Sequence, residues 1–157
     1  MSTCKSRLLI EIRDSLKNKD DDIELSPSKD NILYWIAKLK GPKGTAYEGG
    51  IYRINITIPI QYPLTPPIPT FETPIFHPNI NFTTGEICID VIKHNWSPAW
   101  TLNSLCRAIL SILSDPNPNS PLNCDAGNIL RSNDYKGFNN MAKMYALEYA
   151  QLKKKVF

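Results

Sequence analysis

The sequence lacks a long run of apolar residues: no stretch of its 157 residues approaches the roughly 18 that a membrane-spanning helix needs. Its first residues lead into an amphipathic pattern and not into an apolar leader. It contains only two histidines, and its four cysteines form no C-x-x-C pair. These absences argue against direct membrane insertion, a metal site and a secreted disulfide framework, and they predict a soluble cytoplasmic protein.

A strong charge of either sign is also missing. The 18 Lys and Arg residues against 15 Asp and Glu residues give a net charge of +3, which is too small to indicate nucleic-acid binding. The basic residues gather at the two ends, and the simplest interpretation is solvated helix surface; they are Lys5, Arg7, Lys153, Lys154 and Lys155. The sequence has no glycine-rich loop that would cradle a phosphate, no internal repeat and no low-complexity linker.

The first half of the chain predicts one helix followed by four strands. Apolar residues at helical spacing indicate a helix over residues 2–17; they are Leu8, Leu9, Ile12 and Leu16. After a polar turn, short apolar and alternating patterns predict strands at residues 23–25, 32–39 and 51–58. Proline is dense between residues 59 and 69, which excludes a helix and leaves room for one further short strand near 68–71. These segments predict an antiparallel meander.

Residues 73–101 show no long periodic segment, and their aromatic and isoleucine content favours an ordered, functional loop. Beyond this loop the pattern predicts three helices. The first is a broadly apolar, central helix capped by Thr101 or Asn103; the second is opened by Asn123 or Asp125; the third is capped by Asp134. The predicted apolar side of the last helix consists of Phe138, Met141, Met144, Tyr145 and Tyr149.

Cys88 lies in the irregular loop, a few residues after Asn79. A thiolate can accept an acyl group, and an amide N–H can donate to the oxyanion that forms when an amine attacks the resulting thioester. A lone cysteine among isoleucines is otherwise often an inert core residue. The other cysteines suit structural roles, with Cys4 near a frayed end, Cys106 on an apolar helix face and Cys124 at a helix start.

Four motifs in order resemble the signature set of the ubiquitin-conjugating enzymes. They are Phe-His-Pro-Asn at 76–79, Gly-Glu-Ile-Cys-Ile-Asp at 85–90, Trp-Ser-Pro-Ala at 96–99 and Asp-Pro-Asn-Pro at 115–118. The predicted order of elements is also similar to that family. The resemblance covers essentially the whole chain and implies an α+β ubiquitin-conjugating fold in a single domain over residues 1–157, with an N-terminal helix, a four-stranded meander, a long active-site loop and three C-terminal helices.

The resemblance implies that Cys88 receives ubiquitin from an activating enzyme as a thioester and passes it to a substrate, usually a lysine, with a RING-type ligase. It implies no cofactor for this chain, because the activating enzyme uses ATP upstream. Two alternatives stay open: a catalytically inactive module of the same fold that binds ubiquitin or a ligase, and a conjugating enzyme for another ubiquitin-like modifier. Such modules usually lack the cysteine, so Cys88 argues against the first.

The resemblance also assigns roles around Cys88. Asn79 would donate to the oxyanion or brace the loop that holds Cys88, and His77 would be structural. Ser120 stands where many family members have an acidic residue that helps to deprotonate the incoming lysine; it would act through its hydroxyl or after phosphorylation, and it leaves room for a thiol or hydroxyl acceptor. The further residues expected to support the active site are Asp90, Asn117 and Leu122.

Partner surfaces follow from the same resemblance. The residues that match the surface for RING-type ligases and the activating enzyme are Lys5, Arg7, Leu64, Ser97, Pro98 and Ala99. Residues 95–102, 120–132 and 137–139 also resemble the peroxisomal branch of the family, the peroxin-4 type, which ubiquitinates the import receptor for matrix proteins. Because no apolar anchor is seen, recruitment to the cytosolic face of the peroxisome would need a membrane-anchoring partner.

Overall fold

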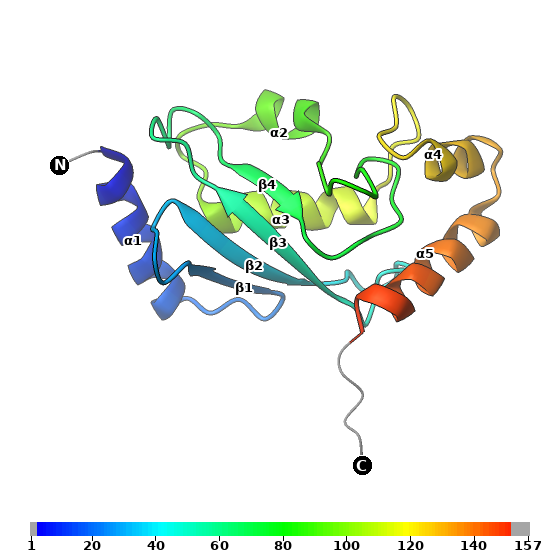
Figure 1. The fold of residues 1–157 in the computed structure, drawn as a ribbon, viewed down its shortest axis with the longest axis horizontal. Helices are drawn as coiled ribbons and strands as arrows, with labels where there is room; N and C mark the ends of the chain where they lie inside the picture. The colour runs from blue at the N-terminus through cyan, green and yellow to red at the C-terminus, as the bar shows by residue number, and fades with distance from the viewer. Residues whose placement is uncertain (1–2, 152–157) are drawn as a thin grey trace, which may run out of the picture.

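The computed structural model describes residues 3–151, apart from the side chains of Ile89 and Val91. Its elements are α1 (Thr3–Lys17), β1 (Ile23–Pro27), β2 (Tyr34–Lys40), β3 (Ile51–Thr57), β4 (Ile68–Phe71), α2 (Ile89–Asn95), α3 (Leu102–Ser114), α4 (Cys124–Arg131) and α5 (Tyr135–Tyr149). The four strands form one antiparallel sheet in chain order, with α1 at one end of the molecule and α4 and α5 at the other (Figure 1). This confirms the predicted α+β meander. Ser2 and the lysines at 153–155 lie outside the described residues.

The core lies between the sheet and α3. The period-two pattern of β2 and β3 places Trp35, Ala37 and Leu39 opposite Ile56, Ile54 and Tyr52, and all six side chains are buried. The α3 residues that pack there are Leu102, Leu105, Cys106, Ile109, Leu110, Ile112 and Leu113, as expected for the central helix. Of the two proposed caps, Thr101 begins α3, since its hydroxyl accepts the Ser104 N–H.

The buried stripe of α1 differs from the predicted one. Leu8 is fully buried and Ile12 packs half-buried against the core, but Leu9 and Leu16 are 45% and 73% exposed. Cys4 and Glu11 are buried instead, so the helix packs through positions 4, 8 and 11, one narrow face at helical spacing. Cys4 therefore lies in the core and not at a frayed end, and burial raises the pKa of its thiol.

Helix α2 was not predicted. It is seven residues long and begins directly after Cys88, within the stretch expected to be irregular. A helix of about two turns has too few residues for a 3.6-residue period to appear in the sequence. The remainder of that stretch is irregular, as expected.

Helices α4 and α5 begin where side chains cap them. The Asn123 side chain accepts the Ala126 N–H, and the Asp134 side chain accepts the Gly137 N–H, so Asn123 opens α4 in preference to Asp125. On α5 the predicted apolar side is only partly covered. Phe138 is buried and Met141 and Tyr145 pack against the core, whereas Met144 and Tyr149 are 49% and 44% exposed, because the helix meets the core through one face at the end of the molecule.

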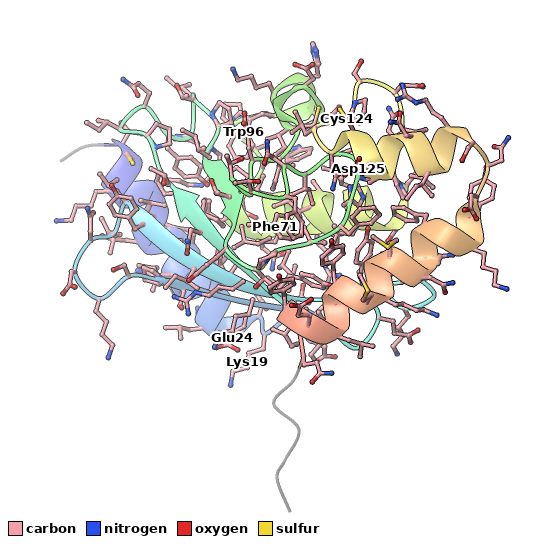
Figure 2. The ribbon with its side chains drawn as sticks, turned by 45° about the vertical axis from the view of Figure 1, so that its right-hand side comes forward. Lys19, Glu24, Phe71, Trp96, Cys124 and Asp125 are labelled. Atoms are coloured by element: carbon pink, nitrogen blue, oxygen red, sulfur yellow. The ribbon has the colours of Figure 1, made fainter. Side chains whose placement is uncertain are left out.

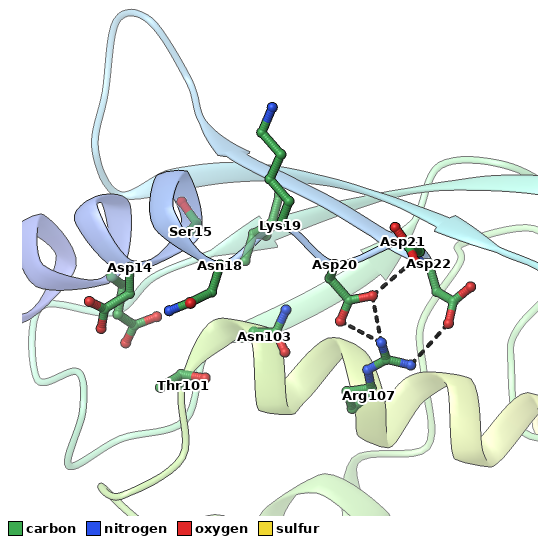
Figure 3. Close-up of a pocket in the computed structure, with 12 residues that line it drawn as sticks. Asp14, Ser15, Asn18, Lys19, Asp20, Asp21, Asp22, Thr101, Asn103 and Arg107 are labelled. Carbon is green, nitrogen blue, oxygen red and sulfur yellow. Dashed lines mark hydrogen bonds and ion pairs between the residues drawn. The ribbon is translucent and has the colours of Figure 1, made fainter.

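An ion pair fixes the turn between α1 and β1 to α3. The Arg107 guanidinium donates to both carboxylate oxygens of Asp20 and, at 3.2 Å, to Asp22 (Figure 3). Burial alone would raise the pKa of Asp20, but hydrogen bonds from the Asp22 amide and from Arg107 outweigh that effect and lower it. The pocket beside this ion pair is lined by residues of α1, the turn, β1 and the first half of α3, and by no residue of the Cys88 loop (Figure 3).

Candidate active site

The segment 76–80 is entirely buried, and His77 fixes it to α3. The Nδ1 atom of His77 accepts the Asn79 amide N–H at 3.0 Å, so in the neutral ring Nε2 carries the proton and donates to the Ile112 carbonyl at 2.8 Å. Burial lowers the pKa of His77 to about 4, although the bond to Ile112 opposes this shift. The ring is therefore neutral at pH 7 and acts as an anchor between the loop and the helix.

A short antiparallel ladder connects this segment to Cys88. After the turn at residues 81–86 the chain runs back, and Ile87 pairs with Ile80 in an isolated bridge. The Cys88 amide N–H then donates to the Asn79 carbonyl at 2.9 Å. The backbone of the cysteine is thus held directly against the backbone of Asn79.

Gly85 allows the turn to pack onto β4. Its φ is +75°, in the left-handed region, and a Cβ at this position would lie 1.9 Å from the Phe71 carbonyl oxygen. The Phe71 N–H donates to the Gly85 carbonyl at 2.9 Å, and the Asn81 side chain accepts two backbone N–H groups within the turn. The turn that leads into Cys88 is therefore fixed to the sheet.

The Asn79 side chain, only 4% exposed, is held at both ends by the backbone of Asn117. Its Nδ2 donates to the Asn117 carbonyl and its Oδ1 accepts the Asn117 N–H, each at 2.9 Å. The adjacent Pro78 carbonyl accepts the N–H groups of Leu122 and Asn123 at 2.8 and 3.1 Å. This is the geometry of a brace between two loops, and it leaves one N–H of Nδ2 outside these bonds.

The four thiols differ in accessibility. Cys4 and Cys106 are buried, and burial raises the pKa of Cys106 to about 12, which keeps this thiol protonated at neutral pH. Cys88 is half-buried, immediately before α2, and Cys124 is exposed at the start of α4 (Figure 2). Cys88 and Cys124 are therefore the candidates for a reactive thiol.

The other expected active-site residues lie on the 117–122 loop and on α2. Asn117 and Leu122 are joined to the 78–79 segment through their backbones, and the Leu122 side chain is 36% exposed. Ser120 is exposed, with φ at +53° in the left-handed region, which aspartate and asparagine adopt more readily than serine. Asp90 is exposed on the first turn of α2, two residues after Cys88.

Two neighbouring loops carry most of the predicted partner surface. Leu64 is 78% exposed, Pro98 and Ala99 are exposed, and Ser97 is half-buried. The Trp96 indole N–H donates to the Pro63 carbonyl at 2.9 Å, which joins the loop after β3 to the loop after α2 (Figure 2). The structure therefore brings Leu64 and the 97–99 segment to one part of the molecule.

The two basic residues of the predicted partner surface differ. Lys5 is exposed on α1, but Arg7 is half-buried and directed at the chain itself. Its guanidinium donates to the carbonyls of Pro98 and Trp100 and to the carboxylate of Glu11. Sequence reasoning missed Glu11; the available signal was its charge, opposite to that of Arg7 and four residues away on the same helix.

Within residues 3–151, no group of three or more His, Cys, Asp or Glu side chains could hold a metal ion. None of the helices in this part of the chain is long and apolar enough to cross a membrane.

We expect the free energy of unfolding to fall as the pH drops from about 7 to about 4. Histidine in the unfolded chain titrates near 6.5, whereas the pKa of folded His77 is about 4, so between these values the unfolded chain binds a proton that the folded chain does not. A difference of this size corresponds to a loss of about 3 kcal/mol. Urea unfolding at a series of pH values would measure it.

Two histidine substitutions, one as the test and one as its control, check the assignment to His77. His77→Gln is expected to flatten the pH dependence, and His94→Gln, which changes an exposed histidine on α2, to leave it as in the native chain. An unchanged slope in His77→Gln would contradict the assignment.

A model of the family described as "Ubiquitin-conjugating enzyme" matches residues 7–146. The protein named PEROXIN-4 from Arabidopsis thaliana is 50% identical over 156 residues, covering 98% of this chain and 99% of the relative. Ubiquitin-conjugating enzyme E2 pex4 from Dictyostelium discoideum is 48% identical, covering 92% of this chain and 97% of the relative.

Solved structures agree. A ubiquitin-conjugating enzyme from Plasmodium yoelii has a TM-score of 0.90 at 36% identity, covering 97% of this chain and 98% of the other. H. polymorpha Pex4p, solved in complex with the soluble domain of Pex22p, has a TM-score of 0.88 at 32% identity, covering 96% and 100%. The match over most of the length shows that the chain belongs to the ubiquitin-conjugating enzyme family and is similar to its peroxin-4 members.

Proposed function

We propose that this ubiquitin-conjugating enzyme carries ubiquitin as a thioester on Cys88 and transfers it to a substrate amine, usually of lysine, with a RING-type ligase. The observation that carries the proposal is the half-buried Cys88 thiol on a backbone held by Asn79, whose own side chain is braced on Asn117. A partly accessible thiol on a backbone that is hydrogen-bonded to the residue carrying an amide donor suits acyl transfer.

The two steps exchange one bond each. In the first, the Cys88 thiolate attacks the carbonyl of ubiquitin on the activating enzyme, a new C–S bond forms, and the thiolate of the activating enzyme leaves. In the second, the substrate amine attacks this carbonyl, the oxyanion forms and collapses, Cys88 leaves as thiolate, and the amine loses a proton to solvent or a neighbouring base. The free Nδ2 proton of Asn79 donates to the oxyanion. The chain needs no cofactor for this, since ATP is used upstream by the activating enzyme.

The loops around Cys88 supply the gate for the incoming amine. Asn117 and Leu122 would line it, and partial removal of water there favours the neutral amine that can attack. Ser120 offers a hydroxyl and no carboxylate, so it supports weak activation of lysine; phosphorylation would add a charge of about −1.5 to −2 and strengthen it. Asp90, on the first turn of α2, is a further carboxylate near Cys88 in the sequence. A thiol or hydroxyl acceptor, which needs less help than an amine, fits the same gate.

The alternatives weighed on the sequence have different requirements. An inactive binding module of this fold has no use for a thiol at position 88 that solvent can partly reach, so the half-buried Cys88 favours the enzyme. A conjugating enzyme for another ubiquitin-like modifier would use the same chemistry, and the names of the relatives favour ubiquitin. The surface formed by Leu64, Pro98 and Ala99 supplies exposed apolar contacts for the RING-type ligase, and α1 with Lys5 would meet the activating enzyme.

We also propose a peroxisomal setting for this activity. Relatives carry peroxin names, and the H. polymorpha protein was solved with the soluble domain of Pex22p. These findings support recruitment of this chain to the cytosolic face of the peroxisome by a membrane-anchoring partner, with the import receptor for matrix proteins as a substrate.

A charging assay tests the enzyme class and the nucleophile together. Purified protein, activating enzyme, ATP and ubiquitin are expected to give an adduct that a reducing agent removes. Cys88→Ala is expected to abolish it, while Cys124→Ala, which removes the other accessible thiol, is expected to keep it. An adduct that survives Cys88→Ala would contradict the proposal. An adduct formed only with another ubiquitin-like modifier would favour the alternative of a conjugating enzyme for that modifier.

Asn79→Ala separates the two roles of that side chain. Loss of two hydrogen bonds to Asn117, at about 1 kcal/mol each, is expected to lower the free energy of unfolding by about 2 kcal/mol. Loss of the oxyanion donor is expected to slow discharge of the thioester to free lysine by about 10²–10³ at a temperature where the variant is folded.

Asn117→Ala is the control for stability, because it keeps both backbone groups that Asn79 contacts. A folded Asn79→Ala variant that discharges at the native rate would limit Asn79 to a brace.

The peroxisomal setting is tested by purifying the tagged protein from gently lysed cells. We expect it to co-purify with a peroxisomal membrane protein and to lose that partner when organelle membranes are removed before purification. Recovery with soluble partners alone would argue against recruitment to the peroxisome.

A further inference from the structure

A buried carboxylate, that of Glu11, joins α1 to the loop before β4 and to the start of α3. Glu11 is 6% exposed, and its Oε1 accepts hydrogen bonds from Arg7 Nε at 3.0 Å and from the Tyr62 hydroxyl. Its Oε2 accepts the backbone N–H of Leu102, the first residue of α3, at 2.9 Å. Burial of a charge is costly unless it is paired and hydrogen-bonded, and here both oxygens are occupied.

Arg7 carries this interaction into the loop after α2. Its Nη1 donates to the Pro98 carbonyl at 2.8 Å and its Nη2 to the Trp100 carbonyl at 2.6 Å. The guanidinium also lies over the Tyr62 ring, 5.9 Å from its centroid. Each of the three guanidinium nitrogens donates to a group of this chain, an arrangement that a lysine with a single ammonium could not reproduce.

The backbone that Arg7 holds is that of the proposed ligase-binding loop. Pro98 and Ala99 are exposed at its tip, and its base is fixed by the Trp96 indole N–H, which donates to the Pro63 carbonyl next to Leu64. The side chains proposed to touch the ligase therefore point outward from a backbone whose inner carbonyls are bound by Arg7.

We propose that Glu11, Arg7 and Tyr62 are positioning residues that set the ligase-binding loop of this enzyme before the ligase arrives. Glu11 holds the Arg7 fork in place, and Arg7 holds the Pro98 and Trp100 carbonyls. The inference rests on the proposed role of this loop in ligase binding. It changes the role of Arg7, which serves the docking surface through the loop backbone and not through contact with the partner.

Such a device affects affinity because an ordered loop does not lose conformational freedom on binding. If the network is broken, the ligase must order residues 97–101 itself, and the cost appears as weaker binding. Glu11 gives the sharpest evidence, because its side chain is only 5% exposed and cannot touch a ligase.

The test measures binding of a RING domain, chosen from a purified panel as the one that most stimulates discharge by the native protein. Glu11→Gln replaces one acceptor oxygen with a donor, and Tyr62→Phe removes only the hydroxyl bonded to Glu11. Each is expected to raise the Kd by about tenfold, since charge-assisted bonds are lost. Arg13→Ala, an exposed basic residue on the same helix, is expected to bind as the native chain does.

A double-mutant cycle distinguishes positioning from direct contact. Arg7→Ala together with Glu11→Gln is expected to bind no more weakly than Arg7→Ala alone, because both changes break one network. Arg7→Lys is expected to bind the RING domain at most about twofold more tightly than Arg7→Ala, since lysine lacks the guanidinium fork. If Arg7→Ala weakens binding while Glu11→Gln and Tyr62→Phe bind at the native Kd, Arg7 acts by contact and the inference is overturned.

Hydrogen exchange on the free proteins reports the loop without any ligase. The amides of Ala99, Trp100 and Leu102 are expected to exchange about tenfold faster in Glu11→Gln than in the native chain. If these amides exchange in Glu11→Gln at the same rate as in the native chain, while the native chain binds the RING domain, the inference is overturned and the proposed ligase role stands. If no RING domain binds the native chain, the proposed ligase role fails and the inference fails with it.

Discussion

The region around Cys88 depends on the satisfaction of polar groups in one buried segment, residues 76–80. Buried backbone and side-chain groups must find partners, and here each partner comes from a different part of the chain. His77 bonds to α3, the Pro78 carbonyl to the residues that open α4, and Asn79 to both Cys88 and Asn117. The proposed nucleophile, Cys88, is thus positioned by hydrogen bonds that the segment must make in order to be buried at all.

Both ends of helix α3 are hydrogen-bonded by side chains from other parts of the chain. The N–H groups of a first helical turn and the carbonyls of a last turn have no partner within the helix. At the start of α3, Glu11 accepts the Leu102 N–H; near its end, His77 donates to the Ile112 carbonyl. The helix therefore lies between the proposed docking loops and the Cys88 loop, with one buried polar side chain at each end.

The proposed thioester chemistry needs a thiol that solvent can reach. Cys106 is placed by an apolar helix face and is silenced by burial, and Cys4 is in the same situation on α1. Cys124 is accessible but lies at a helix start that faces solvent. Cys88 is half-buried, and its backbone N–H donates to the carbonyl of Asn79, whose side chain is held in one orientation by the backbone of Asn117.

The sequence by itself determined the elements whose signals are local. Period-two alternation located β3, the proline-rich stretch bounded β4, Asp134 marked the start of α5, and the four motifs identified the family. Tertiary structure decided what depends on distant partners. Glu11 is buried because Tyr62 and Leu102 meet it from elsewhere in the chain, and Asn79 is a brace because the Asn117 backbone lies opposite it. A charged or polar residue carries no local mark of such partners, since the free energy of its burial is set by groups that only the folded chain brings within hydrogen-bond distance.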